Sequence, residues 1–251
     1  MLAKSIPAHE ADFRQKGVAS NGRSYSLENK SIAIPGSDQS MHYVLCTPTD
    51  GDRSFFYNET VAKQKIVLHF TAGYLKGDVN ALTKKDYHVS VPFLIGRDGT
   101  IFSLFPSMKW SYHLGKGAMG GNQRNSKDSV GIELSNIGPL KLSGNKLLTV
   151  YGDEYCSIEE EQYYTKIEEP FRGYSYFATF TEEQYQSLDI LLKFLTARYQ
   201  IPFELLPENV RFETNEENAG FKGIVSHINF RPSDKWDIGP GFEWERIVNG
   251  Q

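Results

Sequence analysis

The spacing of apolar and polar residues predicts several short buried strands in the middle of the chain. The segment KIVLHF, residues 65–70, is an apolar run typical of a buried strand, and His69 interrupts it. The segment PFLIGRDGTIFSLF, residues 92–105, has two apolar runs joined through Asp98-Gly99, which predicts a β-hairpin. The segment SVGIELSNIG, residues 129–138, predicts another buried strand that ends at a Gly-Pro turn.

The clearest helix is predicted by TEEQYQSLDILLKFLTARYQIP, residues 181–202. Thr181 and Gln184 match the two positions of a capping box at its start. Apolar residues then recur at helical spacing, namely Tyr185, Leu188, Leu191, Leu192 and Leu195. Pro202 lies beyond the end of the helix. The apolar stripe indicates a helix that packs on the core.

The remaining segments have a weaker pattern. Residues 1–60 are polar and interrupted by Gly and Ser, with short strands expected at 31–34 and 42–46, and we interpret them as an extension packed on the main domain. Residues 61–251 form that domain. Residues 141–180 carry many tyrosines without a clear period and indicate an insertion in it. We therefore expect an α/β fold with a central mixed β-sheet flanked by helices.

Composition narrows the class of protein. The 251 residues carry a net charge of −4, and a mean hydropathy of −0.44 is typical of soluble globular proteins. We expect no membrane partner, and the acidic balance gives no basic face for nucleic acid. The first residues, MLAKSIPAHEADF, lack the apolar region of a secretory signal, so we expect synthesis in the cytoplasm. Whether Cys46 and Cys156 pair is open.

Two segments bring together residue types that bind metal ions. A metal-dependent hydrolase needs a few imidazoles or carboxylates around one point, with one coordination position left open. His69 lies at the end of a predicted strand, and SHINFRPSDKWDIGPGF, residues 226–242, places His227, Lys235 and Asp237 on one compact loop. Each residue alone has a simpler explanation, because strand histidines are commonly packed and hydrogen-bonded and loop aspartates commonly form turns.

Five blocks occur in a fixed order along the chain: VLHFTAG, FLIGRDGTIFSLFP, WSYHLG, SVGIEL and SHINFRPSDKWDIGPGF. Together they resemble the zinc-dependent N-acetylmuramoyl-L-alanine amidases of the amidase-2 type, a family that includes phage-lysozyme-type amidases and peptidoglycan recognition proteins. The tyrosine-rich insertion has no match. The resemblance implies the amidase-2 fold, a bound Zn²⁺, and hydrolysis of the amide bond between N-acetylmuramic acid and L-alanine in peptidoglycan or muropeptides.

The same resemblance implies roles for five residues. His69, His227 and Asp237 match the zinc ligands, and the separation of 10 residues between His227 and Asp237 is similar to that in the cytosolic anhydro-muropeptide amidase. Glu133 matches the proposed catalytic acid/base, and Lys235 matches the lysine that stabilises the oxyanion.

One position departs from the family pattern. In the phage-type enzymes a tyrosine-histidine pair precedes the hairpin, but Val91 and Pro92 stand there, four residues after Tyr87 and His88. Either a local bulge restores Tyr87 and His88 to the site, or Glu133 transfers the proton. We favour Glu133.

His113, Asn136 and Trp110 are candidates for substrate binding. The family places groups near His113 and Asn136 at the muropeptide groove, but a loop cap and a turn explain these two residues equally well. Trp110 and the insertion tyrosines could stack on sugar rings or cover the core.

The function also has alternatives. A recognition module would bind muropeptides without cutting them, as family members that lack a zinc ligand do, and a related zinc hydrolase would cut another amide within the stem peptide. The complete ligand set favours the amidase. A phage endolysin, a cytosolic recycling enzyme and a delivered toxin all fit the sequence, and each would reach the cell wall or its fragments differently. The oligomeric state is not predicted.

Overall fold

The centre of the fold is a set of parallel strands that are buried on both faces. The computed structural model describes residues 1–248. All residues of β3 (Lys65–Phe70) are buried, and both of its neighbours, β6 (Ser129–Leu134) and β12 (Ile224–Ser226), run parallel to it. Strands covered on both faces have nearly continuous apolar sequences, which explains the run KIVLHF.

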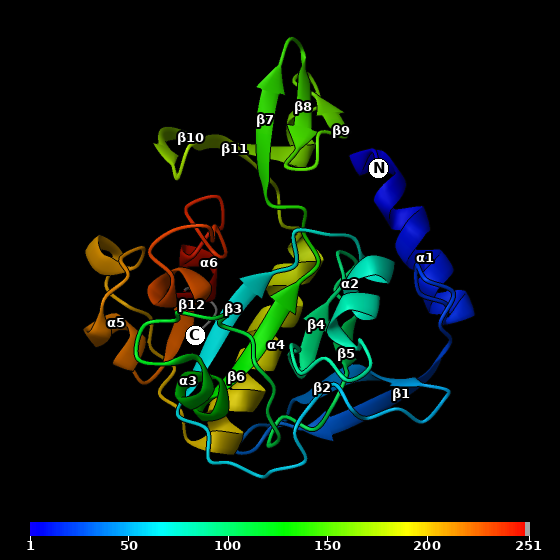
Figure 1. Cartoon of the computed structure of the whole chain (residues 1–251), viewed down its shortest axis with the longest axis vertical. Coiled ribbons are helices and arrows are strands. Elements are labelled where there is room, and N and C mark those ends of the chain that lie inside the picture. Colours follow the sequence, from blue (N-terminus) through cyan, green and yellow to red (C-terminus); the bar gives the residue numbers. More distant parts are fainter. Residues whose placement is uncertain (249–251) are drawn as a thin grey trace.

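The central sheet has the strand order β1-β2-β5-β4-β6-β3-β12 (Figure 1). Its remaining strands are β1 (Tyr25–Ala33), β2 (Ser40–Pro48), β4 (Phe93–Ile95) and β5 (Ile101–Ser103). Strands β4 and β5 form the antiparallel hairpin predicted from Asp98-Gly99. The β1–β2 pair is also antiparallel, whereas β2–β5 and β4–β6 are parallel. The prediction of a mixed α/β fold is confirmed.

Helix α4 (Glu182–Tyr199) covers one face of this sheet. Its capping box is confirmed, since the Gln184 backbone N–H donates to the Thr181 hydroxyl and the Gln184 side chain accepts from the Thr181 N–H. The predicted stripe is buried and packs on alternate residues of β3 and β6, including Leu68 and Ile132. The helix ends at Tyr199, before Pro202.

The opposite face of the sheet is covered by α1 (Ile6–Lys16) and α2 (Leu75–Leu82) at one end. Phe13 and Val79 from these helices pack on Leu94 and Phe102 of the hairpin. Because side chains alternate along a strand, His69 and Glu133 project to this face of the sheet rather than toward α4. The site is therefore on the side of α2.

The N-terminal residues take part in the central sheet. Strand β2 includes the strand expected at 42–46, and β1 contains the strand expected at 31–34 except for Ile34; both strands are longer than expected, and β2 pairs with β5. Helix α1, which the sequence pattern does not predict, is tied to the hairpin because the buried Glu10 carboxylate accepts from the backbone N–H groups of Arg97 and Asp98. The division at residue 60 stays a prediction.

The tyrosine-rich insertion forms a second sheet with the order β10-β11-β7-β8-β9, which projects at the top of Figure 1. Its strands are β7 (Pro139–Ser143), β8 (Lys146–Thr149), β9 (Glu154–Ser157), β10 (Tyr164–Phe171) and β11 (Tyr174–Ala178). One face of this sheet, with Leu140 and Leu147, packs on Ile6 and on Tyr74.

Short helices complete the described chain. They are η1 (Ala3–Ser5), α3 (Asn122–Asp128), η2 (Glu161–Tyr163), η3 (Glu208–Val210), α5 (Glu216–Gly220), η4 (His227–Phe230) and α6 (Glu245–Val248). Cys46 and Cys156 are both buried and free, and they belong to different apolar clusters. Within residues 1–248, no helix has the length and apolar character needed to cross a membrane.

Candidate metal centre and active site

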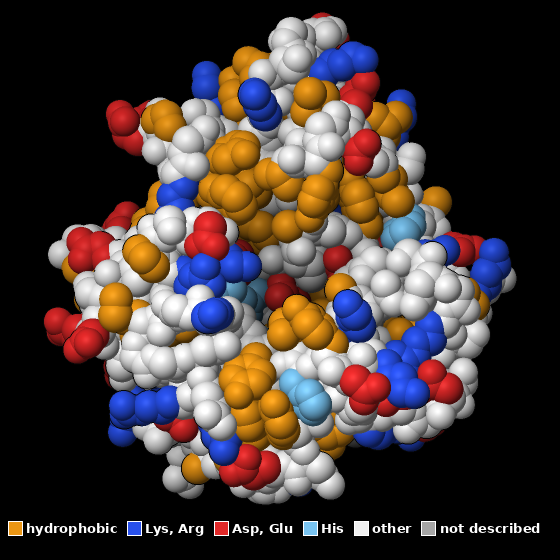
Figure 2. All heavy atoms as spheres, in the orientation of Figure 1, with side chains coloured by type: hydrophobic (Ala, Val, Ile, Leu, Met, Phe, Trp, Pro, Cys, Tyr) orange, Lys and Arg blue, Asp and Glu red, His pale blue; other side chains and the backbone are white. Residues whose placement is uncertain are grey.

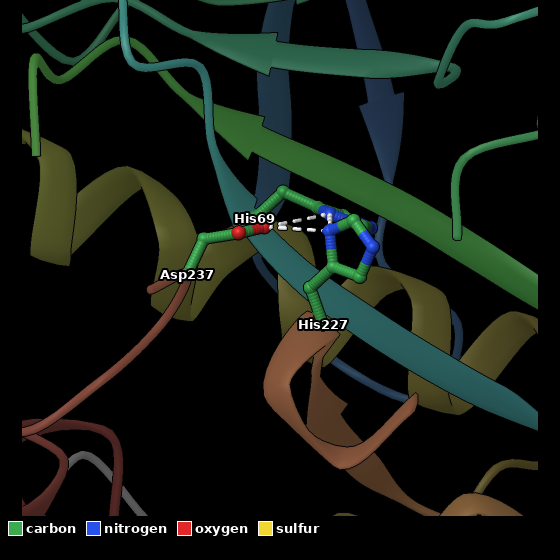
Figure 3. Close-up of side chains that lie close together, drawn as sticks. All are labelled: His69, His227 and Asp237. Carbon is green, nitrogen blue, oxygen red and sulfur yellow. Dashed lines mark hydrogen bonds and ion pairs between the residues drawn. The ribbon is translucent and has the colours of Figure 1, made fainter. Parts of the chain in front are cut away.

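His69, His227 and Asp237 converge because two parallel strands end side by side. Ser226 of β12 is the Cα partner of Leu68 of β3, so His227, the next residue, begins η4 beside His69. The loop that follows η4 returns to the same place, where the Ile228 N–H donates to the Asp237 carbonyl at 3.0 Å. Figure 3 shows the three side chains pointing toward one another from these elements.

The three side chains present one donor atom each to a common point. The Nδ1 atoms of His69 and His227 are 3.0 Å apart, and Asp237 Oδ2 lies 3.0 Å from the first and 2.9 Å from the second. All three residues are buried, and the group has the composition and spacing of a metal site.

A hydrogen-bond chain fixes the tautomer of His69. Ser129 Oγ–H donates to the Asn125 carbonyl at 2.5 Å, so this hydroxyl can only accept from His113 Nε2, at 2.9 Å. His113 Nδ1 then carries a lone pair and accepts from His69 Nε2, also at 2.9 Å. Neutral His69 therefore has its proton on Nε2 and a lone pair on Nδ1.

The tautomer of His227 is fixed independently. Its Nε2 lies 3.0 Å from the Leu114 carbonyl oxygen, which can only accept a hydrogen bond. In its neutral form, His227 therefore carries its proton on Nε2 and also presents a lone pair at Nδ1. Hydrogen bonds of this kind on the outer nitrogen are the usual way in which proteins orient histidine ligands of metals.

The charge states agree with this geometry. Burial lowers the pKa of His69 to about 4, which keeps the ring neutral near pH 7. Burial opposes ionisation of Asp237, but the adjacent His227 and His69 outweigh it and lower the pKa of this carboxyl below its usual value. Two imidazole lone pairs and a carboxylate thus face one another in a buried space, an arrangement that is unfavourable until a cation lies between them. The residues present fit a bound metal ion.

Glu133 is a half-buried residue next to this group. It lies on β6, where it is the Cα partner of His69 on one side and of Leu94 on the other. Its Oε2 atom is buried and has no hydrogen-bond partner. Burial, followed by the negative charges of Asp237 and Asp78, raises the pKa of Glu133 well above its usual value. A carboxyl that is buried, unpartnered and adjacent to a metal group can accept or release a proton there.

A cavity of about 200 Å³ opens onto these residues. Its lining residues include Glu133, Lys235, Trp236 and Val91, together with His227 and Asp237 of the metal group. A larger hollow of about 670 Å³ lies over β2 and β5 and contains none of the metal-binding group. The chemistry therefore belongs to the smaller cavity.

The structure does not bring Tyr87 and His88 into this cavity. Tyr87 is 50% exposed, and the His88 ring stacks on Tyr57 with 4.1 Å between ring centroids. Val91 occupies the cavity wall instead. The position of the missing tyrosine-histidine pair is thus apolar, and Glu133 lines the same cavity.

The three candidates for substrate binding lie in different surroundings. His113 lines the cavity but is engaged by His69 and Ser129, as described above. Asn136 donates to two backbone carbonyls and accepts from the Gly138 N–H, so its side chain stabilises a turn. Trp110 donates to Glu59 and stacks on Tyr57, away from the cavity. Substrate contacts by these residues stay predictions.

The fold and the site together define an α/β protein with a buried His-His-Asp group that could hold a metal ion. The family model for N-acetylmuramoyl-L-alanine amidases of the amidase-2 type matches residues 59–241, and the chain belongs to this family.

Individual relatives are more distant. The chain is 29% identical over 188 residues to the N-acetylmuramoyl-L-alanine amidase AmiD of Escherichia coli K12, a match that covers 73% of this chain and 51% of that protein. The chain therefore spans about half the length of this curated relative. A structure of E. coli AmiD in complex with the substrate anhydro-N-acetylmuramic acid-L-Ala-D-gamma-Glu-L-Lys aligns with 24% identity and a TM-score of 0.49, covering 86% of this chain and 65% of that one. The endolysin amidase LysCS from Clostridium intestinale aligns with 17% identity and a TM-score of 0.41, covering 75% and 83%.

Proposed function

We propose that the chain is a zinc-dependent amidase that hydrolyses the bond between N-acetylmuramic acid and L-alanine in peptidoglycan or its fragments. Membership of the amidase-2 family supports this reaction. The observation that carries the proposal is the convergence of His69 Nδ1, His227 Nδ1 and Asp237 Oδ2 within 3.0 Å of one another beside Glu133, whose buried Oε2 has no hydrogen-bond partner.

These three residues would hold Zn²⁺. Two imidazoles and one carboxylate are a donor set that catalytic zinc sites use, with a further position open to water or substrate. When bound, zinc supplies Lewis acidity toward the amide carbonyl and makes water acidic enough to react near neutral pH. His113 and Leu114 hold the two imidazoles in the tautomers that this role requires.

Glu133 would move the proton. Glu133 lines the cavity and its Oε2 has no hydrogen-bond partner, so the carboxyl is free to take a proton from the attacking water and deliver it to the nitrogen of the departing L-alanine. General acid–base groups of this kind contribute about 10²- to 10⁴-fold to rates.

Lys235 would stabilise the negative charge that develops on the amide oxygen. Its side chain lines the cavity, and its backbone is held because the Arg172 guanidinium donates to the Lys235 carbonyl. Loss of a single such donor typically costs about 3 to 4 kcal/mol of transition-state stabilisation.

The direct test is a digest of purified sacculi and of soluble anhydro-muropeptides with the zinc-loaded protein. The wild type should create new L-alanine amino termini, and mass spectrometry should find intact stem peptides separated from glycan. His227→Ala and Glu133→Gln should release none or nearly none. His42→Ala is the matched control, because His42 is exposed on β2 and far from the group.

Three results would contradict the proposal in different ways. Binding of muropeptides without any release by the zinc-loaded wild type would identify a recognition module. Products cut within the stem peptide would identify a different amide hydrolase. Full activity of His227→Ala would remove the metal group from the mechanism.

A further inference from the structure

The insertion sheet contacts two loops that line the metal cavity, the cavity of about 200 Å³ beside His227 and Asp237. Tyr151, in the turn between β8 and β9, donates its hydroxyl to the Ala72 carbonyl at 3.0 Å, and Ala72 lines the cavity. Arg172, in the turn between β10 and β11, donates to the carbonyls of Lys235 and Arg231. The Trp236 indole N–H in turn donates to the Arg172 carbonyl at 3.3 Å. The insertion is therefore fixed to both the β3–α2 loop and the Asp237 loop.

Two aromatic rings of the insertion lie at these contacts, one exposed and one half-buried. Tyr151 is 69% exposed although its hydroxyl is held. Tyr174 lies edge-on to Trp236, with 5.6 Å between ring centroids, and Trp236 lines the metal cavity. Figure 2 shows hydrophobic side chains gathered along the part of the insertion that faces a central hollow, with histidine and acidic side chains at its bottom.

A second hollow of about 380 Å³ continues from Tyr174 along the insertion sheet. It forms where β7 and β11 stop pairing beyond Tyr176 and Leu140, and it is lined by Leu142, Tyr174 and Tyr176. The rest of this face is buried against η1 and Tyr74. The apolar face is thus covered at one end and open at the end nearest Trp236.

The chemistry of the proposed substrate suits this surface. The scissile amide joins the peptide to a sugar, so a sugar ring must lie within a few ångströms of the metal group and the glycan must leave the cavity along one of its walls. A pyranose ring has an apolar C–H face and a polar rim, which matches an exposed tyrosine ring with an anchored hydroxyl. The insertion offers such rings in contact with Ala72 and Trp236, two residues that line the cavity.

We propose that the insertion sheet binds the glycan strand of the substrate, with Tyr151 and Tyr174 stacking on sugar rings on either side of the muramic acid that carries the scissile bond. This inference rests on the proposed amidase function and specifies its substrate class: muropeptides that still carry a glycan chain are preferred over those with a single muramic acid residue.

The first test measures binding without catalysis. Peptide-free glycan strands are titrated into the full chain, with and without zinc, by isothermal calorimetry. Tyr151→Ala and Tyr174→Leu should each weaken binding by roughly fivefold, the effect of losing one aromatic stacking contact. Tyr151→Phe, which keeps the ring, should retain most of the affinity. Tyr87→Ala is the matched control, because Tyr87 is a half-exposed tyrosine outside the cavity. Tyr174→Leu keeps apolar bulk at a half-buried position, and a thermal melt verifies that each variant is folded.

The second test compares hydrolysis of a glycan-linked muropeptide with that of a single-sugar muropeptide. The tyrosine variants should raise KM for the glycan-linked substrate and leave kcat and the single-sugar substrate nearly unchanged. The proposal would be overturned if the wild type and both variants bound glycan strands with equal affinity. It would also be overturned if the variants lost activity equally on the glycan-linked and the single-sugar substrate. Binding of sugar-free stem peptides that is lost in the same variants would assign the surface to peptide instead. Failure of the amidase function is distinguishable, because the wild type would then bind glycan strands but hydrolyse neither substrate.

Discussion

Replacing His113 with alanine removes the group that accepts the hydrogen bond from His69 Nε2. In the wild type, His113 bridges His69 and Ser129 with two contacts of 2.9 Å. Without this bridge, the His69 ring can rotate and can place its proton on Nδ1, the atom that faces the metal group. Loss of such an outer partner typically lowers metal affinity by about 10- to 100-fold, which corresponds to roughly 1.4 to 2.7 kcal/mol.

The assay is a competition titration of the zinc-free protein against a chelator of known affinity at pH 7. His113→Gln is an informative second variant, because its amide oxygen can accept from His69 Nε2 and should restore part of the affinity. His88→Ala is the control, since His88 stacks on Tyr57 outside the cavity. Zinc binding by His113→Ala within about twofold of the wild type would show that the hydrogen-bond chain does not orient His69.

Three further predictions concern catalysis and stability. Glu133→Gln should lower kcat by about 10²- to 10⁴-fold, because the variant has lost the group that transfers the proton. Its zinc content, measured by elemental analysis, should stay at the wild-type level. An unchanged kcat would exclude Glu133 as the proton-transfer group. Burial raises the pKa of Asp78 from its ordinary 3.8 to about 7, so the protonated carboxyl stabilises the fold at acid pH and this contribution is lost as the pH rises through about 7. The unfolding free energy of the wild type should therefore fall between about pH 4 and pH 7, and Asp78→Asn should remove on the order of 2 to 4 kcal/mol of this fall. Urea unfolding of the two metal-free proteins measures this difference. Parallel pH profiles of the wild type and the variant would contradict it. Glu10→Ala should lower the unfolding free energy by about 2 kcal/mol, because two backbone N–H groups of the hairpin lose their acceptor, whereas Glu28→Ala on the exposed part of β1 should change it little.

The elements that the sequence predicts well are those with strong local signals. The helix of residues 181–202 has both its capping box and its apolar stripe in the sequence, and the structure contains both. The hairpin at Asp98-Gly99 is equally local. The convergence of His69, His227 and Asp237 could be anticipated only from the ordered blocks, because the residues lie on separate segments that parallel strand pairing brings together.

Other features depend on contacts between distant segments and leave no pattern in the sequence. The insertion forms a five-stranded sheet, but its strands carry tyrosines on half-buried faces and so lack the alternation of apolar and polar residues that identifies a strand. Helix α1 is amphipathic only weakly, and it is positioned by Glu10 on a hairpin nearly ninety residues away. The role of His113 depends on Ser129 and Asn125, whose relation to His69 exists only in the folded chain.

The most direct test of the central claim is a titration of the zinc-free protein with Zn²⁺ in the presence of soluble muropeptides, with new L-alanine amino termini counted at each step. Release should rise in proportion to added zinc, reach its plateau at one equivalent, and be absent at every ratio in His227→Ala. Release by the zinc-free wild type, or no release at any zinc ratio on muropeptides or sacculi, would contradict the central claim.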